Sequence, residues 1–192
     1  MFITFEGIEG SGKSTQIKLL GDNLTQRGHK VEIVREPGGT ELGEKIRNIF
    51  LSSSEEKIAP FSEVMLLYAS RKNLDVNVIR PNLQANNIVI ADRYSDATIA
   101  YQSHGKGLDA QVIKHIHNFA NISNPNLTFY IDINENLSKQ RISGREIDRM
   151  EKESLEFFSR VRSGYLEISR NNNRVHIIAV SYTHLRAHET HL

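Results

Sequence analysis

The protein has 192 residues, of which 39% are hydrophobic and 24% are charged, and its formal net charge is +1. This length predicts a single domain, and the balanced charge does not favour a protein that coats nucleic acid. The sequence contains no cysteine, which excludes disulfides, thiolate metal sites and a cysteine nucleophile. No apolar run approaches the ~20 residues of a membrane span, and the N-terminal residues do not resemble a signal peptide. We therefore expect a cytoplasmic protein that binds neither membrane nor nucleic acid.

Five short apolar runs, rich in β-branched and aromatic residues, predict the strands of a sheet. They cover residues 2–5, 31–34, 88–91, 127–131 and 175–180. Between them, apolar residues recur at helical spacing over residues 14–27, 62–84, 109–119 and 153–169. Pro81 is expected to kink or break the second of these helices. Strands that alternate with helices predict an α/β fold with a parallel sheet covered on both faces, and residues 52–57 and 143–149 are predicted to be mobile loops.

A glycine-rich segment follows the first predicted strand. Residues 7–14 read GIEGSGKS, which matches G-x-x-x-x-G-K-[ST] completely, and they lie between a predicted strand and a predicted helix. The glycines allow backbone N–H groups to point at phosphate oxygens, and the helix N-terminus adds partial positive charge. We expect Lys13 to reach the β- and γ-phosphates of a nucleotide and the Ser14 hydroxyl to bind Mg²⁺.

A carboxylate ends the third predicted strand. Asp92 follows the apolar run 88–91 as in a Walker-B strand, where it is placed to hold Mg²⁺ directly or through water. A regulatory GTPase would also need the strings N-K-x-D and D-x-x-G, and neither occurs in this sequence. The phosphate-binding loop (P-loop) formed by residues 7–14 therefore does not predict a GTP-driven switch.

Arginines gather where ligands bind in such sheets, at the carboxyl ends of the strands. Arg93 follows Asp92 directly, Arg35 opens the string REPGGT after the second strand, and Arg71 lies on the next helix. A further set brackets a glycine-containing loop and consists of Arg141, Arg145 and Arg149. A loop of this kind predicts a lid that closes over the site.

These strings together resemble the bacterial type of thymidylate kinase, the family that makes dTDP from dTMP. The matching strings are residues 7–14, 35–40, 68–71, 92–94, 100–102, 124–127 and 148–149. The resemblance implies a three-layer P-loop nucleoside-monophosphate kinase fold, with a five-stranded parallel sheet and helices on both faces. It also implies a kinase domain over residues 1–180, a lid at about residues 141–150, a homodimer, and ATP and Mg²⁺ as phosphate donor and metal.

The resemblance also implies roles for single positions. The ATP site would consist of Gly7, Ile8, Glu9, Gly10, Ser11, Gly12, Lys13, Ser14 and Thr15. Magnesium would be held by Ser14, Asp92 and Glu9. The catalytic set would be Lys13, Arg93, Glu9 and the lid arginines Arg141, Arg145 and Arg149. The dTMP site would consist of Glu36, Pro37, Leu67, Arg71, Arg93, Thr98, Tyr101 and Gln102.

Three of these acceptor residues have more specific implied roles. Arg71 would read the edge of thymine, and Tyr101 would occupy the space of a ribose 2′-OH. The family usually has a phenylalanine four residues before the position of Arg71, where it stacks on thymine. This sequence has Leu67 there, followed by Tyr68, so we expect an apolar contact without stacking.

The charge of the acceptor decides which chemistry the site must supply. A monophosphate has a second pKa of about 6, so its oxygen is already a nucleophile at neutral pH and needs no general base. The site must instead supply cations and in-line alignment. Two alternatives remain: a deoxynucleoside kinase with Glu36 as its base, and a non-catalytic P-loop protein that binds nucleotide.

The last segment departs from this pattern. Residues 181–192 include three histidines and few apolar residues, where the resemblance implies a loop and one more amphipathic helix. We interpret them as a non-native tail on a truncated gene, which would lower stability and ATP affinity. His115 and His117 are two residues apart on a predicted helix, so we expect surface or packed side chains and no metal site.

Overall fold

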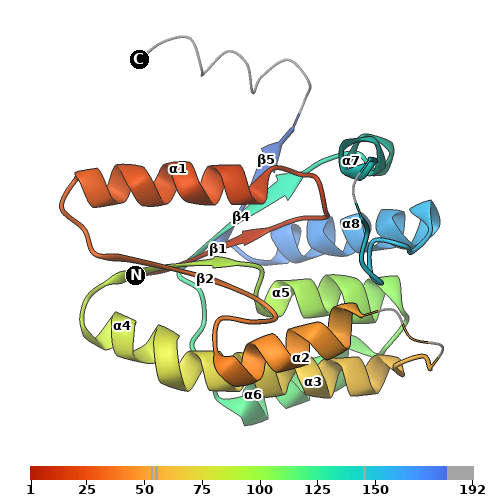
Figure 1. The fold of residues 1–192 in the computed structure, drawn as a ribbon, viewed down its shortest axis with the longest axis horizontal. Helices are drawn as coiled ribbons and strands as arrows, with labels where there is room; N and C mark the ends of the chain where they lie inside the picture. The colour runs from red at the N-terminus through yellow and green to blue at the C-terminus, as the bar shows by residue number, and fades with distance from the viewer. Residues whose placement is uncertain (53, 55, 145, 181–192) are drawn as a thin grey trace.

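A computed structural model describes residues 1–52, 54, 56–144 and 146–180 of the chain as one five-stranded parallel sheet with helices around it (Figure 1). The strand order is β2-β3-β1-β4-β5, and every pairing is parallel. The strands are β1 (Phe2–Glu6), β2 (Val31–Arg35), β3 (Ile88–Asp92), β4 (Leu127–Asp132) and β5 (Val175–Ala179). The predicted α/β class and all five strands are confirmed. The proposed tail, residues 181–192, and Arg145 lie outside the described residues.

Helices cover both faces of the sheet. They are α1 (Lys13–Gln26), α2 (Glu41–Leu51), α3 (Pro60–Leu74), α4 (Arg80–Gln84), α5 (Ser95–Thr98), α6 (Ala110–Ala120), α7 (Glu135–Ile142) and α8 (Leu155–Asn171), with π-helices η1 (Asp75–Ile79) and η2 (Ile99–Gly105). Helix α1 lies on one face, and α4, α5 and α8 lie on the opposite face (Figure 1). Among the described residues, no helix is long and apolar enough to cross a bilayer.

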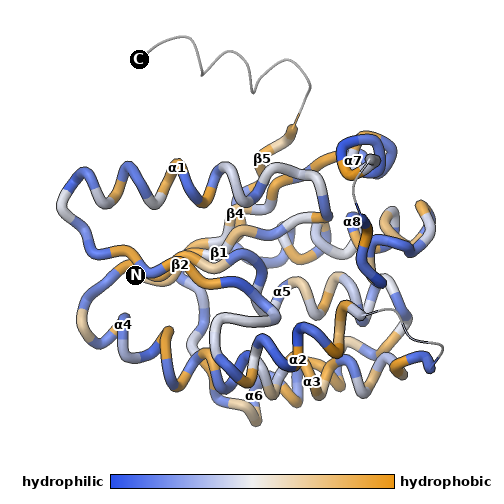
Figure 2. Tube along the Cα trace, viewed as in Figure 1, coloured by the Kyte–Doolittle hydropathy of each residue, from blue (hydrophilic) through white to orange (hydrophobic). Residues whose placement is uncertain are grey.

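Burial explains the apolar sequences of the central strands β1 and β3. Every residue of β1 is buried, and alternate side chains enter two different clusters. Ile3 packs with Ile17 of α1, whereas Phe2 packs with Val64 of α3. Apolar residues therefore run along the strands, while α1 alternates between apolar and polar residues (Figure 2).

The second predicted helix is interrupted earlier than expected. The α-helix ends at Leu74, the π-helical turn η1 follows, and Pro81 lies in the first turn of α4. A proline ring clashes with the carbonyl four residues before it, and a π-turn is one way to accommodate this. The predicted loops at 52–57 and 143–149 contain no helix or strand among their described residues.

Candidate active site

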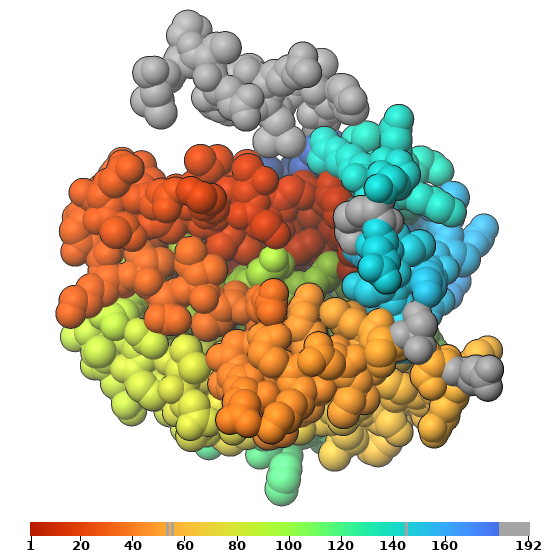
Figure 3. All heavy atoms as spheres, in the orientation of Figure 1, coloured from red at the N-terminus to blue at the C-terminus, as the bar shows by residue number. Residues whose placement is uncertain are grey.

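A cavity of about 580 Å³ opens at the carboxyl ends of β1, β2 and β3. The surface is hollowed there between the P-loop side, α2 and the segment after α7 (Figure 3). The predicted residues that line it are Glu9, Gly10, Gly12, Lys13, Ser14, Thr15, Glu36, Pro37, Leu67, Arg71, Asp92, Arg93, Thr98, Tyr101, Gln102 and Arg141. The cavity is also lined by residues to which the sequence analysis assigned no site role, namely Arg47, Phe50, Leu51, Tyr94, Ala97, Asp148, Met150 and Glu151.

The P-loop forms one end of the cavity. Gly12 has a φ of 96° at the N-cap of α1, a left-handed conformation that glycine adopts without strain. Lys13 is buried, and its Nζ donates to the carbonyl oxygens of Gly7 at 2.9 Å and Ile8 at 3.0 Å. Burial and then the charge of Arg93 lower the pKa of Lys13 to about 8. Bound phosphate would favour the protonated lysine, because it would place negative charge beside it.

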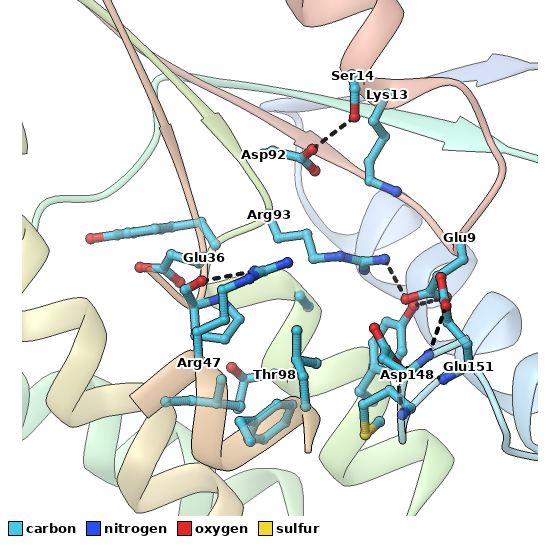
Figure 4. Close-up of a pocket in the computed structure, with 18 of the residues that line it drawn as sticks. Glu9, Lys13, Ser14, Glu36, Arg47, Asp92, Arg93, Thr98, Asp148 and Glu151 are labelled. Atoms are coloured by element: carbon cyan, nitrogen blue, oxygen red, sulfur yellow. Dashed lines mark hydrogen bonds and ion pairs between the residues drawn. The ribbon is translucent and has the colours of Figure 1, made fainter. Parts of the chain in front are cut away.

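The predicted metal ligands Ser14 and Asp92 lie together at this end (Figure 4). Ser14 Oγ donates to Asp92 Oδ2 at 3.3 Å, although the two residues come from the start of α1 and the end of β3. Hydroxyl and carboxylate oxygens are the protein ligands that Mg²⁺ prefers.

Arg93 lies between the two ends of the cavity and has strained backbone geometry. Its φ is 68°, which is unusual for a residue with a large side chain. Its Nη2 donates to Glu9 Oε1 at 2.7 Å, and Glu9 Oε2 accepts from the Tyr101 hydroxyl at 2.8 Å. Burial alone would raise the pKa of Glu9, but Arg93 and Lys13 lower it below its ordinary value. The site therefore holds a charged Glu9 that orients Arg93.

A buried carboxylate supports the backbone around Arg93. Glu6 is fully buried at the end of β1, where its Oε1 accepts from Tyr94 N at 2.8 Å and its Oε2 accepts from the Tyr165 hydroxyl at 2.9 Å. Burial and then the charge of Asp96 raise the pKa of Glu6 to about 7. Glu6 thus fixes the peptide that follows the strained residue.

This raised pKa predicts a pH-dependent contribution to stability. The folded state holds the Glu6 proton more tightly than the unfolded state, whose pKa is near 4.5, so Glu6 lowers stability as pH rises from about 5 to about 8. Glu6→Gln removes the titration. As pH rises from about 5 to about 8, we expect the unfolding free energy of this variant to rise relative to that of wild type by on the order of 1–3 kcal/mol. Urea unfolding at several pH values measures the difference, and a difference independent of pH would contradict this account.

A buried ion pair forms the opposite end of the cavity. Arg71 Nε donates to Glu36 Oε2 at 2.7 Å, and its Nη2 donates to Tyr94 O at 3.1 Å and Thr98 Oγ1 at 3.0 Å. Burial raises the pKa of Glu36 to about 7 despite the attraction of Arg71. Arg71 Nη1 and Glu36 Oε1 are buried without a hydrogen-bond partner among the described residues, so both atoms are available to a ligand.

Phe50, an aromatic residue at this end of the cavity, comes from helix α2, which the sequence analysis did not predict. Leu67 lines the cavity as expected, whereas Tyr68 is buried against the core and its ring centroid lies 4.7 Å from the guanidinium carbon of Arg71. Phe50 and Arg47 project from the same side of α2 and line the cavity. Arg47 Nη1 donates to Pro37 O at 2.9 Å. The detectable signal was Thr40, whose hydroxyl caps this helix by accepting from Gly43 N.

The two described lid arginines lie in different surroundings. Arg141 is exposed, lines the cavity and donates from Nη1 to Gly10 O at 3.1 Å. Arg149 does not line the cavity; its Nη1 donates to Glu63 Oε1 at 2.8 Å. The structure thus places Arg141 at the P-loop and Arg149 behind the acceptor end.

His115 lies at the surface and His117 is partly packed, as expected for both positions. His115 is exposed, and His117 lies within hydrogen-bonding distance of the Tyr68 hydroxyl, 3.3 Å, and of Asn124 Oδ1, 3.0 Å. Within the described ranges, no group of three or more histidine, aspartate and glutamate side chains is placed to hold a metal ion.

Comparison with known proteins identifies the family. The model of the family described as thymidylate kinase matches residues 5–190. The thymidylate kinase of Sulfurihydrogenibium sp. (strain YO3AOP1) is 46% identical over 88% of this chain and 83% of its own length. The thymidylate kinase of Kosmotoga olearia is 42% identical over 98% of this chain and 92% of its own length. The crystal structure of thymidylate kinase from Ehrlichia chaffeensis superimposes with a TM-score of 0.79 at 37% identity, covering 96% of this chain and 89% of that one. The chain therefore belongs to the thymidylate kinase family.

Proposed function

We propose that this protein transfers the γ-phosphate of ATP to dTMP and releases ADP and dTDP. One observation carries the proposal: a single cavity has the P-loop Lys13 at one end, the buried Arg71–Glu36 pair at the other, and Arg93 between them. A donor phosphate and a nucleoside monophosphate fit these ends, and membership of the thymidylate kinase family supports their identity.

The cations of the site perform the main chemical task. A dianionic acceptor repels the donor phosphates, so the rate depends on charge compensation and alignment. We infer that Lys13 binds donor oxygens, and that Arg93 binds the acceptor phosphate and the group in transfer. Because Arg93 is paired with Glu9 at 2.7 Å, an incoming phosphate must share or replace that contact. Glu9 thereby holds Arg93 in position until the acceptor binds.

Magnesium fits the oxygen ligands at the P-loop end. Ser14 and Asp92 would hold the ion, and Glu9 lies on the other side of Arg93, where it contacts Arg93 and Tyr101. When bound, Mg²⁺ neutralises charge on the donor phosphates. We propose residues 141–150 as the lid of a kinase domain over residues 1–180, with Arg141 and Arg145 approaching the phosphates as it closes.

The deoxynucleoside kinase alternative requires Glu36 as a free base. Its carboxylate is instead almost completely buried and paired with Arg71 at 2.7 Å, which favours a role in holding the acceptor. ATP carrying a radioactive γ-phosphate tests the proposal when it is offered with dTMP or with thymidine. We expect label in dTDP. Label in dTMP formed from thymidine would support the alternative, and nucleotide binding without acceptor-dependent transfer would support a non-catalytic protein.

Tyr101 is placed to select the sugar of the acceptor. Its buried ring lines the cavity, and its hydroxyl donates to Glu9 at 2.8 Å. We expect Tyr101→Ala to raise the ratio of kcat/KM for UMP over dUMP by about 10- to 200-fold, because it opens the space of the 2′-OH. Tyr101→Phe keeps the ring and serves as the matched control, with an unchanged ratio. If Tyr101→Ala also leaves the ratio unchanged, the ring does not select the sugar.

We propose that the protein is a cytoplasmic homodimer. Large apolar side chains are exposed on three neighbouring helices, α2, α3 and α6 (Figure 1). They are Leu42, Ile49, Phe61, Met65 and Phe119, and Phe119 is 93% exposed. A second copy of the chain would cover this apolar face, as homodimer interfaces are richer in apolar area than the remaining surface.

Phe119→Glu tests the dimer. We expect the dissociation constant to rise by more than ~100-fold, because the variant loses an apolar anchor and buries a charge. Light scattering coupled to size-exclusion chromatography measures the mass over a range of concentrations. Leu19→Glu is the matched control, since Leu19 is 57% exposed on α1, away from this face. A wild-type monomer, or equal effects of both substitutions, would contradict the proposal.

A further inference from the structure

One fully buried carboxylate connects the lid to the acceptor end of the cavity. Glu63 lies on α3, and its Oε1 accepts from Arg149 Nη1 at 2.8 Å and from Lys106 Nζ at 2.6 Å. Its Oε2 accepts from Gln102 Nε2 at 3.0 Å. Glu63 thus joins three segments that are far apart in the sequence: the end of the lid, η2 and α3.

The remaining contacts of Arg149 also face the protein interior. Its Nε donates to Phe50 O at 2.8 Å, and its guanidinium carbon lies 5.0 Å from the centroid of the Phe50 ring. Its backbone N donates to Leu51 O at 3.2 Å. Its Nη2 is buried without a partner among the described residues. Two of the three guanidinium nitrogens are thus bound inside the protein, and Arg149 is not among the residues that line the cavity.

The two residues held by this arrangement are walls of the acceptor end. Phe50 and Gln102 both line the cavity. The carbonyl oxygen of Phe50 accepts a hydrogen bond from Arg149, and the side-chain amide of Gln102 donates one to Glu63. Because the side-chain amide nitrogen of Gln102 donates a hydrogen bond to Glu63, its amide oxygen is left to accept one from a ligand. A buried carboxylate needs compensating cations, so loss of Arg149 would disturb both walls.

On the basis of the proposed function, we propose that Arg149 is a positioning residue: through Glu63 it fixes Phe50 and Gln102 around the acceptor base, and it does not contact the transferred phosphoryl group. The lid segment after α7 is then fastened to the base pocket at one end, while Arg141 remains at the P-loop. This assignment replaces the catalytic role that the sequence resemblance implied for Arg149.

The test distinguishes contacts with the acceptor base from contacts with its phosphate. It compares dTMP with 2-deoxyribose 5-phosphate, which carries the sugar and phosphate but no base. Calorimetry measures dTMP and 2-deoxyribose 5-phosphate binding to wild type, Arg149→Met and Glu63→Gln, and steady-state kinetics gives kcat and the KM values. For both variants, we expect dTMP to bind about 10- to 100-fold more weakly, as for the loss of one charge-assisted hydrogen bond. Binding of 2-deoxyribose 5-phosphate and the KM for ATP should change less than about threefold. The double variant should be no weaker than the weaker single variant, because the two residues act as one unit.

Other outcomes would overturn the assignment. Arg149 would be a phosphate-binding catalytic residue if Arg149→Met weakened the binding of dTMP and of 2-deoxyribose 5-phosphate equally. The same would follow from a kcat about 1000-fold lower with unchanged dTMP affinity. If Arg149→Met unfolds because Glu63 then has only Lys106 as its cation, the double variant provides the same comparison without that buried carboxylate. Arg170→Met, an exposed substitution on α8, is the matched control. A wild type that binds both ligands but does not phosphorylate dTMP would contradict the proposed function, whereas the binding comparison would still decide the role of Arg149.

Discussion

Lys13→Met is expected to lower kcat by about two to three orders of magnitude at saturating ATP and dTMP. Lys13 is buried at the P-loop, and its Nζ contacts only groups of that loop, at Gly7, Ile8 and Ser11, among the described residues. A bound donor would bring phosphate oxygens to this preformed cation, and methionine fills the same space without charge. The loss should therefore appear in the transition state more than in the fold.

Lys18→Met is the matched control for this substitution. Lys18 lies on the same helix, is 77% exposed and pairs only with Asp22 among the described residues. Its replacement should leave kcat within about twofold of wild type, because exposed ion pairs contribute little. A Lys13→Met enzyme with nearly wild-type kcat would contradict the placement of the donor phosphates.

Arg71→Met is expected to lower the unfolding free energy by about 3–5 kcal/mol at pH 8, because it leaves the Glu36 carboxylate buried without its cation. Both side chains of this pair are almost completely buried, at 1% and 3% exposed. The loss should be smaller at pH 6, since the pKa of Glu36 is about 7 and the protonated acid carries no charge. Chemical denaturation at the two pH values measures the effect.

A second substitution distinguishes stability from recognition. Adding Glu36→Gln to Arg71→Met removes the uncompensated charge, so we expect most of the unfolding free energy to return. Binding of dTMP should stay impaired, because the arginine nitrogen that faces the acceptor end is still absent. A double variant that regains dTMP affinity would show that Arg71 acts on the fold alone.

The sequence predicted the parts of the molecule that depend on local pattern. The strands begin where their apolar runs begin, and for β1 and β3 the reason is that a strand buried on both faces has no polar alternation. Residues 7–14 predicted the P-loop, and the register of parallel strands then brought Asp92 beside Ser14. These features follow from short segments and from the rule that parallel strands present their carboxyl ends at one edge.

The features that the sequence did not predict depend on distant partners. Phe50 and Arg47 enter the cavity because of the way α2 packs on α3, and no motif marks that orientation. Arg149 resembles Arg141 as a lid arginine, but its partner Glu63 precedes it by 86 residues. The pairing of Glu36 with Arg71 was likewise invisible, although each residue was expected at the acceptor end. The role of an arginine follows from the groups around it, and the fold determines those groups.

This cavity is expected to phosphorylate a thymidine monophosphate with ATP. Coupled measurement of ADP release checks this activity, with Mg·ATP as donor and dTMP, dUMP, UMP, CMP or thymidine as acceptor. We expect the highest kcat/KM with dTMP, weaker turnover with UMP and CMP, and none with thymidine. Turnover of thymidine above that of dTMP, or ADP release that is independent of the acceptor, would contradict it.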